Sequence, residues 1–344
     1  MYRYFIRPIL FTFSPETIHR LIVVLVQVGF KIPGVKWLVA SMYKFEDVSL
    51  ERTVCGLTFK NPVGLAAGFD KNATFFNEFS TFGFSHIEIG TVTPKGQPGN
   101  PKPRSFRIPR DKGLINRMGF NNKGLQACIK QLAGKPHDVI IGGNIGKNTA
   151  TPNQEAIQDY IVTFKGLYEH VDYFVVNLSC PNIKDLRALQ DQDSTVAILK
   201  ELVLLRATKT THKPIFLKIS PDLTLEQLDG VLETVKLTHI DGIVATNTTV
   251  SREGLKTANE QVEAIGNGGL SGAPLTDRST EIIRYLAEKS NHSIPIIGVG
   301  GIMSAEDALE KLKAGASLIQ IYSGFIYEGP ALIKRINKAI KQQQ

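Results

Sequence analysis

The sequence predicts an α/β fold, a (β/α)8 TIM barrel with an N-terminal helical extension, and three observations lead to this prediction. Eight apolar runs of strand length recur along the chain from residue 63 onward. Amphipathic stretches of helical length lie between several of them. The runs are continuously apolar instead of alternating, which is typical of parallel strands covered by helices. A count of eight favours a closed barrel over an open sheet.

The chain is expected to begin with helices. Ser14 and Pro15 form a typical helix start, because serine caps a first turn and proline fits the first helical position. We expect this helix to run to about Gly29, followed by a short helix over 34–42 and a small hairpin or lid over 50–61. We assign 1–45 to an amphipathic extension and 46–344 to the barrel. The predicted barrel strands are 63–67, 86–91, 139–144, 173–178, 215–219, 242–246, 296–299 and 318–322, and the predicted helices include 225–237, 277–289 and 305–314.

The composition is that of an ordinary soluble protein. Hydrophobic residues make up 42% of the 344 residues, which is enough for a sizeable core. Cys55, Cys128 and Cys180 lack the paired spacing of a disulfide framework or a zinc site. We therefore expect no metal and a reducing compartment.

The first 45 residues are both basic and apolar. They hold six lysines and arginines against one glutamate, a net charge of six minus one, or +5. Basic residues interleaved with aromatic ones suit an anionic membrane surface better than nucleic acid, which we do not expect as a partner. The apolar run over 21–26 is far shorter than the ~20 residues of a spanning helix. Its helix either lies at a membrane interface or packs into the main core.

Polar or glycine-rich segments follow nearly every predicted strand. Barrels place their chemistry at these carboxyl ends, so the pattern indicates an enzyme. Glycine turns follow strands seven and eight, at Gly300–Gly301 and Tyr322–Ser323, and Gly272 adds a third flexible contact. They are either tight turns without a ligand or a phosphate site, and their pairing favours phosphate.

Lysine, asparagine and cysteine side chains at other strand ends indicate the chemistry. Lys218 is either a Schiff-base nucleophile or a fixed charge beside a reduced flavin. Four asparagines favour the flavin, because amides suit a planar ring that carries carbonyl and N–H groups; they are Asn116, Asn177, Asn182 and Asn247. Cys180, in NLSCPN, is either a buried inert thiol or a base, and its polar surroundings favour the base.

A long loop rich in proline and glycine precedes Asn116, and we expect it to be an irregular wall over the pocket. Arg117 either binds an acidic ligand or pairs at the surface. His19, on the first predicted helix, is expected to be a surface histidine.

Together these segments resemble the dihydroorotate dehydrogenase family, specifically its class 2, the membrane-associated and quinone-dependent branch. They span the chain from about residue 50 to its end, and the SPETIHR start resembles the class 2 extension. The matching strings are GLAAGFDKN, EIGTVTP with QPGNPKPR, LINRMGFNN, GGNIGKN, VVNLSCPN, ATNTT, GGLSG, PIIGVGGI and IQIYSGFIY.

The resemblance implies oxidation of dihydroorotate to orotate in pyrimidine biosynthesis, with FMN as cofactor and a membrane quinone as acceptor. The positions implied for FMN are Ala67, Gly68, Phe69, Asp70, Lys71, Thr91, Asn144, Asn177, Lys218, Thr246, Gly272, Gly301, Tyr322 and Ser323. Those implied for dihydroorotate are Lys71, Asn116, Arg117, Met118, Gly119, Phe120, Asn177, Asn182, Asn247 and Thr248, with Lys71 facing the substrate carboxylate. The base position falls on Cys180, which would take the proton from C5 while hydride leaves C6 for flavin N5.

The resemblance also implies that the N-terminal helices form a quinone tunnel on a peripheral protein, held at the cytoplasmic, inner face of the cell membrane by anionic lipid. One residue departs from the class 2 pattern, since class 2 members usually carry serine where this chain has Cys180. Two rival functions stay open at this point. One is a soluble class 1-like enzyme that passes electrons to fumarate or a protein partner, and the other is a Schiff-base barrel lyase that uses Lys218.

Overall fold

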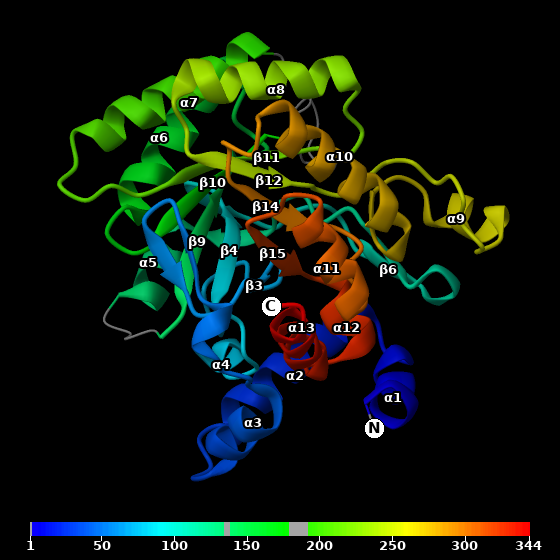
Figure 1. Ribbon diagram of the computed structural model, residues 1–344. Coiled ribbons are helices and arrows are strands. Elements are labelled where there is room, and N and C mark those ends of the chain that lie inside the picture. Colours follow the sequence, from blue (N-terminus) through cyan, green and yellow to red (C-terminus); the bar gives the residue numbers. More distant parts are fainter. Residues whose placement is uncertain (1, 134–137, 179–191) are drawn as a thin grey trace.

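The computed structural model describes residues 2–133, 138–178 and 192–344, and it confirms the predicted barrel (Figure 1). Eight parallel strands close in the order β3, β4, β9, β10, β11, β12, β14, β15. Each overlaps one of the eight predicted runs. They are β3 (Val63–Leu65), β4 (His86–Val92), β9 (Ile140–Ile145), β10 (Tyr173–Asn177), β11 (Ile215–Ile219), β12 (Gly242–Ala245), β14 (Ile296–Val299) and β15 (Leu318–Ile321).

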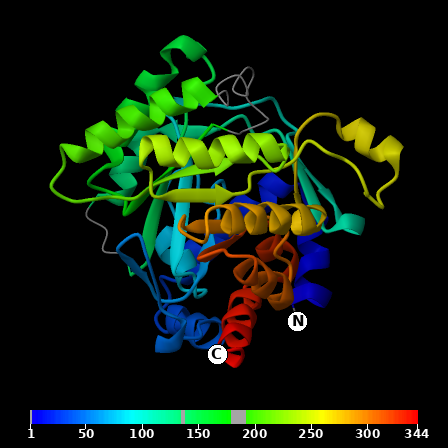
Figure 2. The same ribbon diagram turned by 45° about the horizontal axis from the view of Figure 1, so that its top comes forward.

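Helices cover the outside of the barrel, and Figure 2 shows α6, α7 and α8 in green side by side along one wall. The three predicted helices are α8, α10 and α11, and Thr224 starts α8 with a capping box that includes Gln227. The outer helices are α4 (Phe76–Ser80), α5 (Leu125–Leu132), α6 (Ala156–Leu167), α7 (Gln192–Ala207), α8 (Leu225–Thr238), α10 (Thr276–Lys289), α11 (Ala305–Lys313), α12 (Ser323–Glu328) and α13 (Ala331–Gln342). Short 3-10 turns are η2 (Val48–Leu50), η3 (Pro109–Asp111), η4 (Asn153–Glu155) and η6 (Ala273–Leu275).

Large rings fill the barrel at the amino ends of its strands. The predicted hairpin, β1 (Arg52–Val54) with β2 (Leu57–Phe59), packs Phe59 against this interior cluster. Glycines make room for the rings: a Cβ on Gly142 would lie 2.3 Å from the ring of Tyr173. The interior at this end is therefore solid, which leaves the carboxyl end for a ligand.

An antiparallel sheet lies beside the barrel and corrects our expectation of an irregular loop before Asn116. It pairs β6 (Ser105–Ile108), β7 (Gly113–Asn116) and β13 (Gly269–Gly272), and α9 (Asn259–Ile265) packs on it around a small separate core. A further pair is β5 (Lys95–Gln97) with β8 (Asn122–Gly124). These strands have only three or four residues each, so their alternation is too short to outweigh the proline and glycine signals.

The N-terminal extension is helical as predicted, and it begins with two elements that we did not predict, η1 (Tyr2–Ile6) and α1 (Arg7–Phe11). α2 (Pro15–Gly29) has the predicted bounds, and the Ser14 hydroxyl accepts a hydrogen bond from the Thr17 N–H at 3.3 Å. α3 (Val35–Tyr43) follows and contacts the C-terminal helix α13, as the blue and red ribbons show (Figure 1). Across the described residues, we find no helix that combines the length and apolarity needed to span a membrane.

α2 has one packed face and one exposed face. Ile18 is buried, and Val23 and Val26 pack against the main core. The opposite face leaves 45–56% of four large side chains exposed, namely Leu21, Val24, Leu25 and Val28. Of the two alternatives left open by the sequence, packing into the main core is confirmed for one face of this helix, and the membrane interface stays a prediction for the exposed face.

A largely buried ion pair joins α2 to the segment before β6. Nε and Nη2 of Arg104 each lie 3.1 Å from one carboxylate oxygen of Glu16. Nη1 of the same guanidinium donates to the carbonyls of Pro98 and Asn100. The two side chains are 7% and 18% exposed, so this paired contact is largely withheld from water.

Replacing Arg104 with alanine should loosen α2, because Glu16 would then be left half-buried without its partner. The expected loss is about 3 kcal/mol, at the lower end of the range for a broken buried pair. Hydrogen exchange over residues 15–29 measures it as faster exchange. Glu46→Gln is the matched control, since its pair with Lys44 is exposed and should contribute below about 1 kcal/mol; equal exchange in both variants would contradict the role given to Arg104.

Candidate active site

Amide and hydroxyl side chains from four strand ends meet at the barrel mouth. Thr91 Oγ1 donates to Asn144 Oδ1 at 2.5 Å, and Asn177 Nδ2 lies 3.1 Å from Thr91 Oγ1 and 3.4 Å from Asn144 Oδ1. Asn247 Nδ2 donates to Asn177 Oδ1 at 3.3 Å. Thr246 is buried beside them, and Thr248 N–H donates to Asn247 Oδ1 at 2.9 Å. The structure therefore brings these predicted residues together.

Lys218 lies within the barrel just below these amides, beside a carboxylate that the sequence analysis missed. Its Nζ is 3.4 Å from Glu88 Oε1, and Glu88 is completely buried in β4. Glu88 also accepts from Asn144 Nδ2 at 2.7 Å and from Gln320 Nε2 at 2.8 Å. A signal for both was present, since a glutamate in HIEIG and a glutamine in LIQI interrupt otherwise apolar strands.

The segment after β3 shapes one side of the mouth. Lys71 Nζ donates to the Gly68 carbonyl at 2.7 Å, and burial lowers the pKa of Lys71 to about 8, with Glu16 opposing the shift. The Asp70 carboxylate accepts from the N–H groups of Thr74 and Phe75 at 2.9 Å each. Asp70 thus shapes the turn, and burial raises the pKa of its carboxyl. Ala67 and Phe69 lie in the same segment, and the Phe69 ring packs on Tyr322.

The glycine turns have the close approaches expected of an anion cradle. Gly301 has φ +72°, and a Cβ there would lie 2.3 Å from the Thr276 backbone. Gly272 has φ +100°, and a Cβ there would lie 2.3 Å from the Lys112 carbonyl. Ser323, the first residue of α12, is 2.9 Å from the hydroxyl of Ser271. Only glycine fits either turn.

The segment 116–120 lies beside the mouth, but the guanidinium of Arg117 serves the neighbouring sheet. Its Nη1 donates to the carbonyls of Ile265 and Asn267 at the end of α9, at 2.5 and 3.0 Å. The group also lies 4.6 Å from the centroid of the Phe106 ring. Of our two interpretations, structural pairing is the one observed.

The remaining members of this segment form a turn. Asn116 Nδ2 donates to the Gly269 carbonyl at 3.4 Å. Met118 accepts through its carbonyl from Asn100 N–H, Gly119 has φ +67° and Phe120 has φ +50°. Cys180 and Asn182 lie outside the described residues, so their roles stay predictions.

His19 is packed, not free at the surface, which corrects our expectation. Its ring centroid lies 4.9 Å from that of Phe69 and 5.7 Å from that of Phe75. Burial, with a smaller contribution from Lys71, lowers the pKa of His19 to about 4. The aromatic partners are distant in sequence, and for that reason the helical pattern alone did not reveal the contact.

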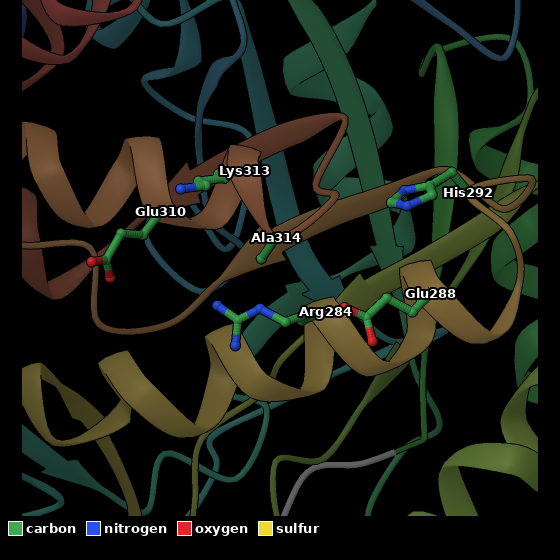
Figure 3. Close-up of a pocket in the computed structure, with 6 residues that line it drawn as sticks. All are labelled: Arg284, Glu288, His292, Glu310, Lys313 and Ala314. Atoms are coloured by element: carbon green, nitrogen blue, oxygen red, sulfur yellow. The ribbon is translucent and has the colours of Figure 1, made fainter.

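A cavity of about 360 Å³ opens elsewhere, on the outer wall (Figure 3). Its lining side chains come from α10, α11 and the turns after them: Arg284, Glu288, His292, Glu310, Lys313 and Ala314. All but Ala314 are exposed, and they include both basic and acidic side chains. None of them is at a strand end, so this cavity is separate from the candidate active site.

A closed parallel barrel with buried polar side chains at the carboxyl ends of its strands defines the class of barrel enzymes. Within that class, the family model described as dihydroorotate dehydrogenase matches residues 49–343. The chain belongs to the dihydroorotate dehydrogenase family, as its motifs predicted.

Similar proteins match this chain over nearly its whole length. A protein of Christiangramia forsetii named dihydroorotate dehydrogenase (quinone) is 56% identical over 343 residues, covering 100% of this chain and 99% of its own length. The Thermosynechococcus vestitus protein of the same name is 44% identical, covering 98% and 96%. Among solved structures, Eimeria tenella DHODH in complex with ferulenol has a TM-score of 0.83 at 34% identity, covering 96% of this chain and 91% of that one.

Acidification should loosen α2 through His19. Its folded pKa of about 4 lies below the unfolded value of about 6.5, so the folded state disfavours the charged ring. The stability from neutral His19 is present above pH 6.5 and is lost as the pH falls toward 4. The expected loss is up to about 3 kcal/mol.

Urea unfolding at pH 7 and pH 4.5, for the wild type and His19→Phe, measures this effect. Other histidines such as His86 titrate in both proteins and cancel in the difference. The variant should lose less stability on acidification, and equal losses would contradict the assignment.

Proposed function

We propose that the chain oxidises dihydroorotate to orotate in pyrimidine biosynthesis, with FMN as cofactor and a membrane quinone as electron acceptor. The carrying observation is the set of buried amides around Lys218 at the barrel mouth. The names of the full-length relatives support the reaction and the acceptor.

The described residues fit FMN in both of its parts. Two glycine turns at which a Cβ would clash, together with the Ser271 and Ser323 hydroxyls, suit a phosphate group. The amides of Asn144 and Asn177 suit the polar edge of a flat ring, and Lys218 places a positive charge beside them. Bound FMN would supply the acceptor for the hydride that leaves C6 of the substrate.

The chain's own residues would bind and deprotonate the substrate. Lys71, with a pKa of about 8, is mostly protonated at pH 7 and can face a carboxylate, whose charge would raise that pKa further. Asn247 and Asn177 can orient the ring amides of dihydroorotate. Cys180 would accept the C5 proton.

The geometry argues against the lyase alternative. A Schiff-base lysine must lose its proton before it attacks a carbonyl. Lys218 instead is engaged in an ion pair with the buried carboxylate of Glu88, 3.4 Å from its Nζ. The purified protein should therefore be yellow, be bleached by dihydroorotate without oxygen and be recoloured by quinone; a colourless protein trapped by borohydride would contradict the proposal.

The extension would bring the chain to the membrane as a peripheral protein. Apolar side chains exposed on η1, α1, α2, α3 and the turn before α2 include Tyr4, Phe5, Ile9, Phe13, Leu21, Leu25, Val28, Trp37 and Leu38. The net charge of this region suits the anionic lipids that the cytoplasmic leaflet carries, so we propose attachment at the inner face of the membrane. Residues 1–45 would thus guide the quinone, and 46–344 would carry FMN.

Replacing Cys180 with alanine should lower kcat for dihydroorotate oxidation by roughly 10²–10⁴-fold, because the proton acceptor is lost. Cys180→Ser should retain part of the activity, with its pH profile displaced to higher pH, since a hydroxyl is less acidic than a thiol. Steady-state rates from pH 6 to 10 measure both effects, and FMN absorbance confirms intact binding. An undiminished rate in the alanine variant would refute the assignment.

Replacing Leu21, Leu25 and Val28 together with serine should abolish binding to vesicles of phosphatidylglycerol, because the exposed face of α2 loses its apolar area. FMN bleaching by dihydroorotate should persist. The matched control replaces Leu204, Leu225 and Leu237, which are equally exposed on α7 and α8. Flotation of both variants with vesicles measures binding, and equal recovery would contradict the membrane role of α2.

A further inference from the structure

Glu88 lies at the centre of a buried network that the proposed reaction does not by itself require. It is in the middle of β4, points into the barrel and is 0% exposed. Both carboxylate oxygens have partners: Oε1 accepts from Asn144 and contacts Lys218, and Oε2 accepts from Gln320. These three partners come from β9, β11 and β15.

The carboxylate determines how Asn144 presents its amide. Asn144 Nδ2 is 2.7 Å from Glu88 Oε1, so its Oδ1 faces Thr91 and Asn177. The flipped amide would bring Oδ1 against a carboxylate, which is repulsive. Glu88 therefore fixes which side of Asn144 carries the acceptor at the mouth.

The same carboxylate holds the ammonium of Lys218. The two side chains are 0% and 6% exposed, so water screens their interaction weakly. Without Glu88, Lys218 would be a nearly buried cation that has lost this carboxylate beside its ammonium group. The electric field at the mouth is thus that of the Lys218–Glu88 ion pair, which is weaker than the field of a lone ammonium group.

We propose that Glu88 is a positioning residue that orients Asn144 and Lys218 toward the flavin and limits the positive potential that Lys218 applies to it. This inference rests on the proposed function, because it requires a flavin at the mouth. Gln320 assists by holding the second carboxylate oxygen.

Glu88→Gln tests the charge with little change in volume. The new amide can still accept from Asn144. If the Gln320 side-chain amide turns over, the new amide can also donate to Gln320 Oε1, which has no partner in the described structure. Reduced flavin gains negative charge near N1, so a Lys218 that has lost the opposing charge of Glu88 should favour the reduced form. We expect the equilibrium to shift at least tenfold toward reduced flavin, a rise of about 30 mV for two electrons.

The readout is the midpoint potential of bound FMN, measured spectrophotometrically with reference dyes. Asp111→Asn is the matched control, because it likewise converts a buried carboxylate to an amide. The Asp111 carboxylate lies outside the barrel and accepts from the backbone N–H groups of Lys256 and Thr257. The substitution should lower stability and leave the potential unchanged. An unchanged or lower potential in Glu88→Gln, with FMN bound, would overturn the inference.

Gln320→Met separates charge from hydrogen bonding, because it keeps the carboxylate and removes one donor. The midpoint potential of its FMN should rise less than that of Glu88→Gln, and an equal or larger rise would overturn the charge argument.

If Glu88→Gln does not fold, Glu88→Asp replaces it. Withdrawing the carboxylate by one methylene should weaken FMN binding at least tenfold, and unaltered affinity and potential would overturn the inference. Wild-type protein without FMN would instead refute the proposed function.

Discussion

Closure of the barrel is the constraint on which the site depends. Eight parallel strands converge only if their inward residues fill the interior, and this chain does so with rings and glycines at the amino ends. Because Gly142 has no side chain, the Tyr173 ring can lie against its backbone, and the Phe216 ring lies against Gly242 in the same way. With that end solid, polar residues can gather near the other, where Thr91, Asn144 and Asn177 approach within hydrogen-bonding distance.

A polar barrel interior costs free energy unless every buried group finds a partner. The network around Glu88 meets most of that demand, because four strands supply its members and both carboxylate oxygens are satisfied. Two neighbouring atoms, His86 Nε2 and Gln320 Oε1, are buried without a partner in the described structure. The satisfied and unsatisfied groups lie in the same interior, in which each unpaired polar atom costs free energy.

The fold was predictable because its signals are local and repeated. Each barrel strand is an apolar run. The start of α2 is set by two adjacent residues, Ser14 as its N-cap and Pro15 as its first residue. The site was predictable where motifs matched, as at Lys218 and Asn177. Glu88 and Gln320 were missed because their partners are far away in sequence, and only barrel closure brings them together. The small antiparallel sheet was not predicted, because its strands are too short to show the alternation of apolar and polar residues that indicates a strand.

α2 joins the two ends of the proposed electron path in a single element. Its outer face carries exposed Leu25, and its inner face contacts the segment after β3 through His19, and through Gln27, which donates to the Thr74 carbonyl. That segment includes Phe69 and Lys71, and Lys71 also lies in the field of Glu16. A displacement of α2 would therefore be transmitted to the residues after β3 that shape the barrel mouth. Under the proposed function this packing would link membrane attachment to substrate binding, because a shift of α2 would disturb the Glu16–Arg104 pair and the His19–Phe69 contact.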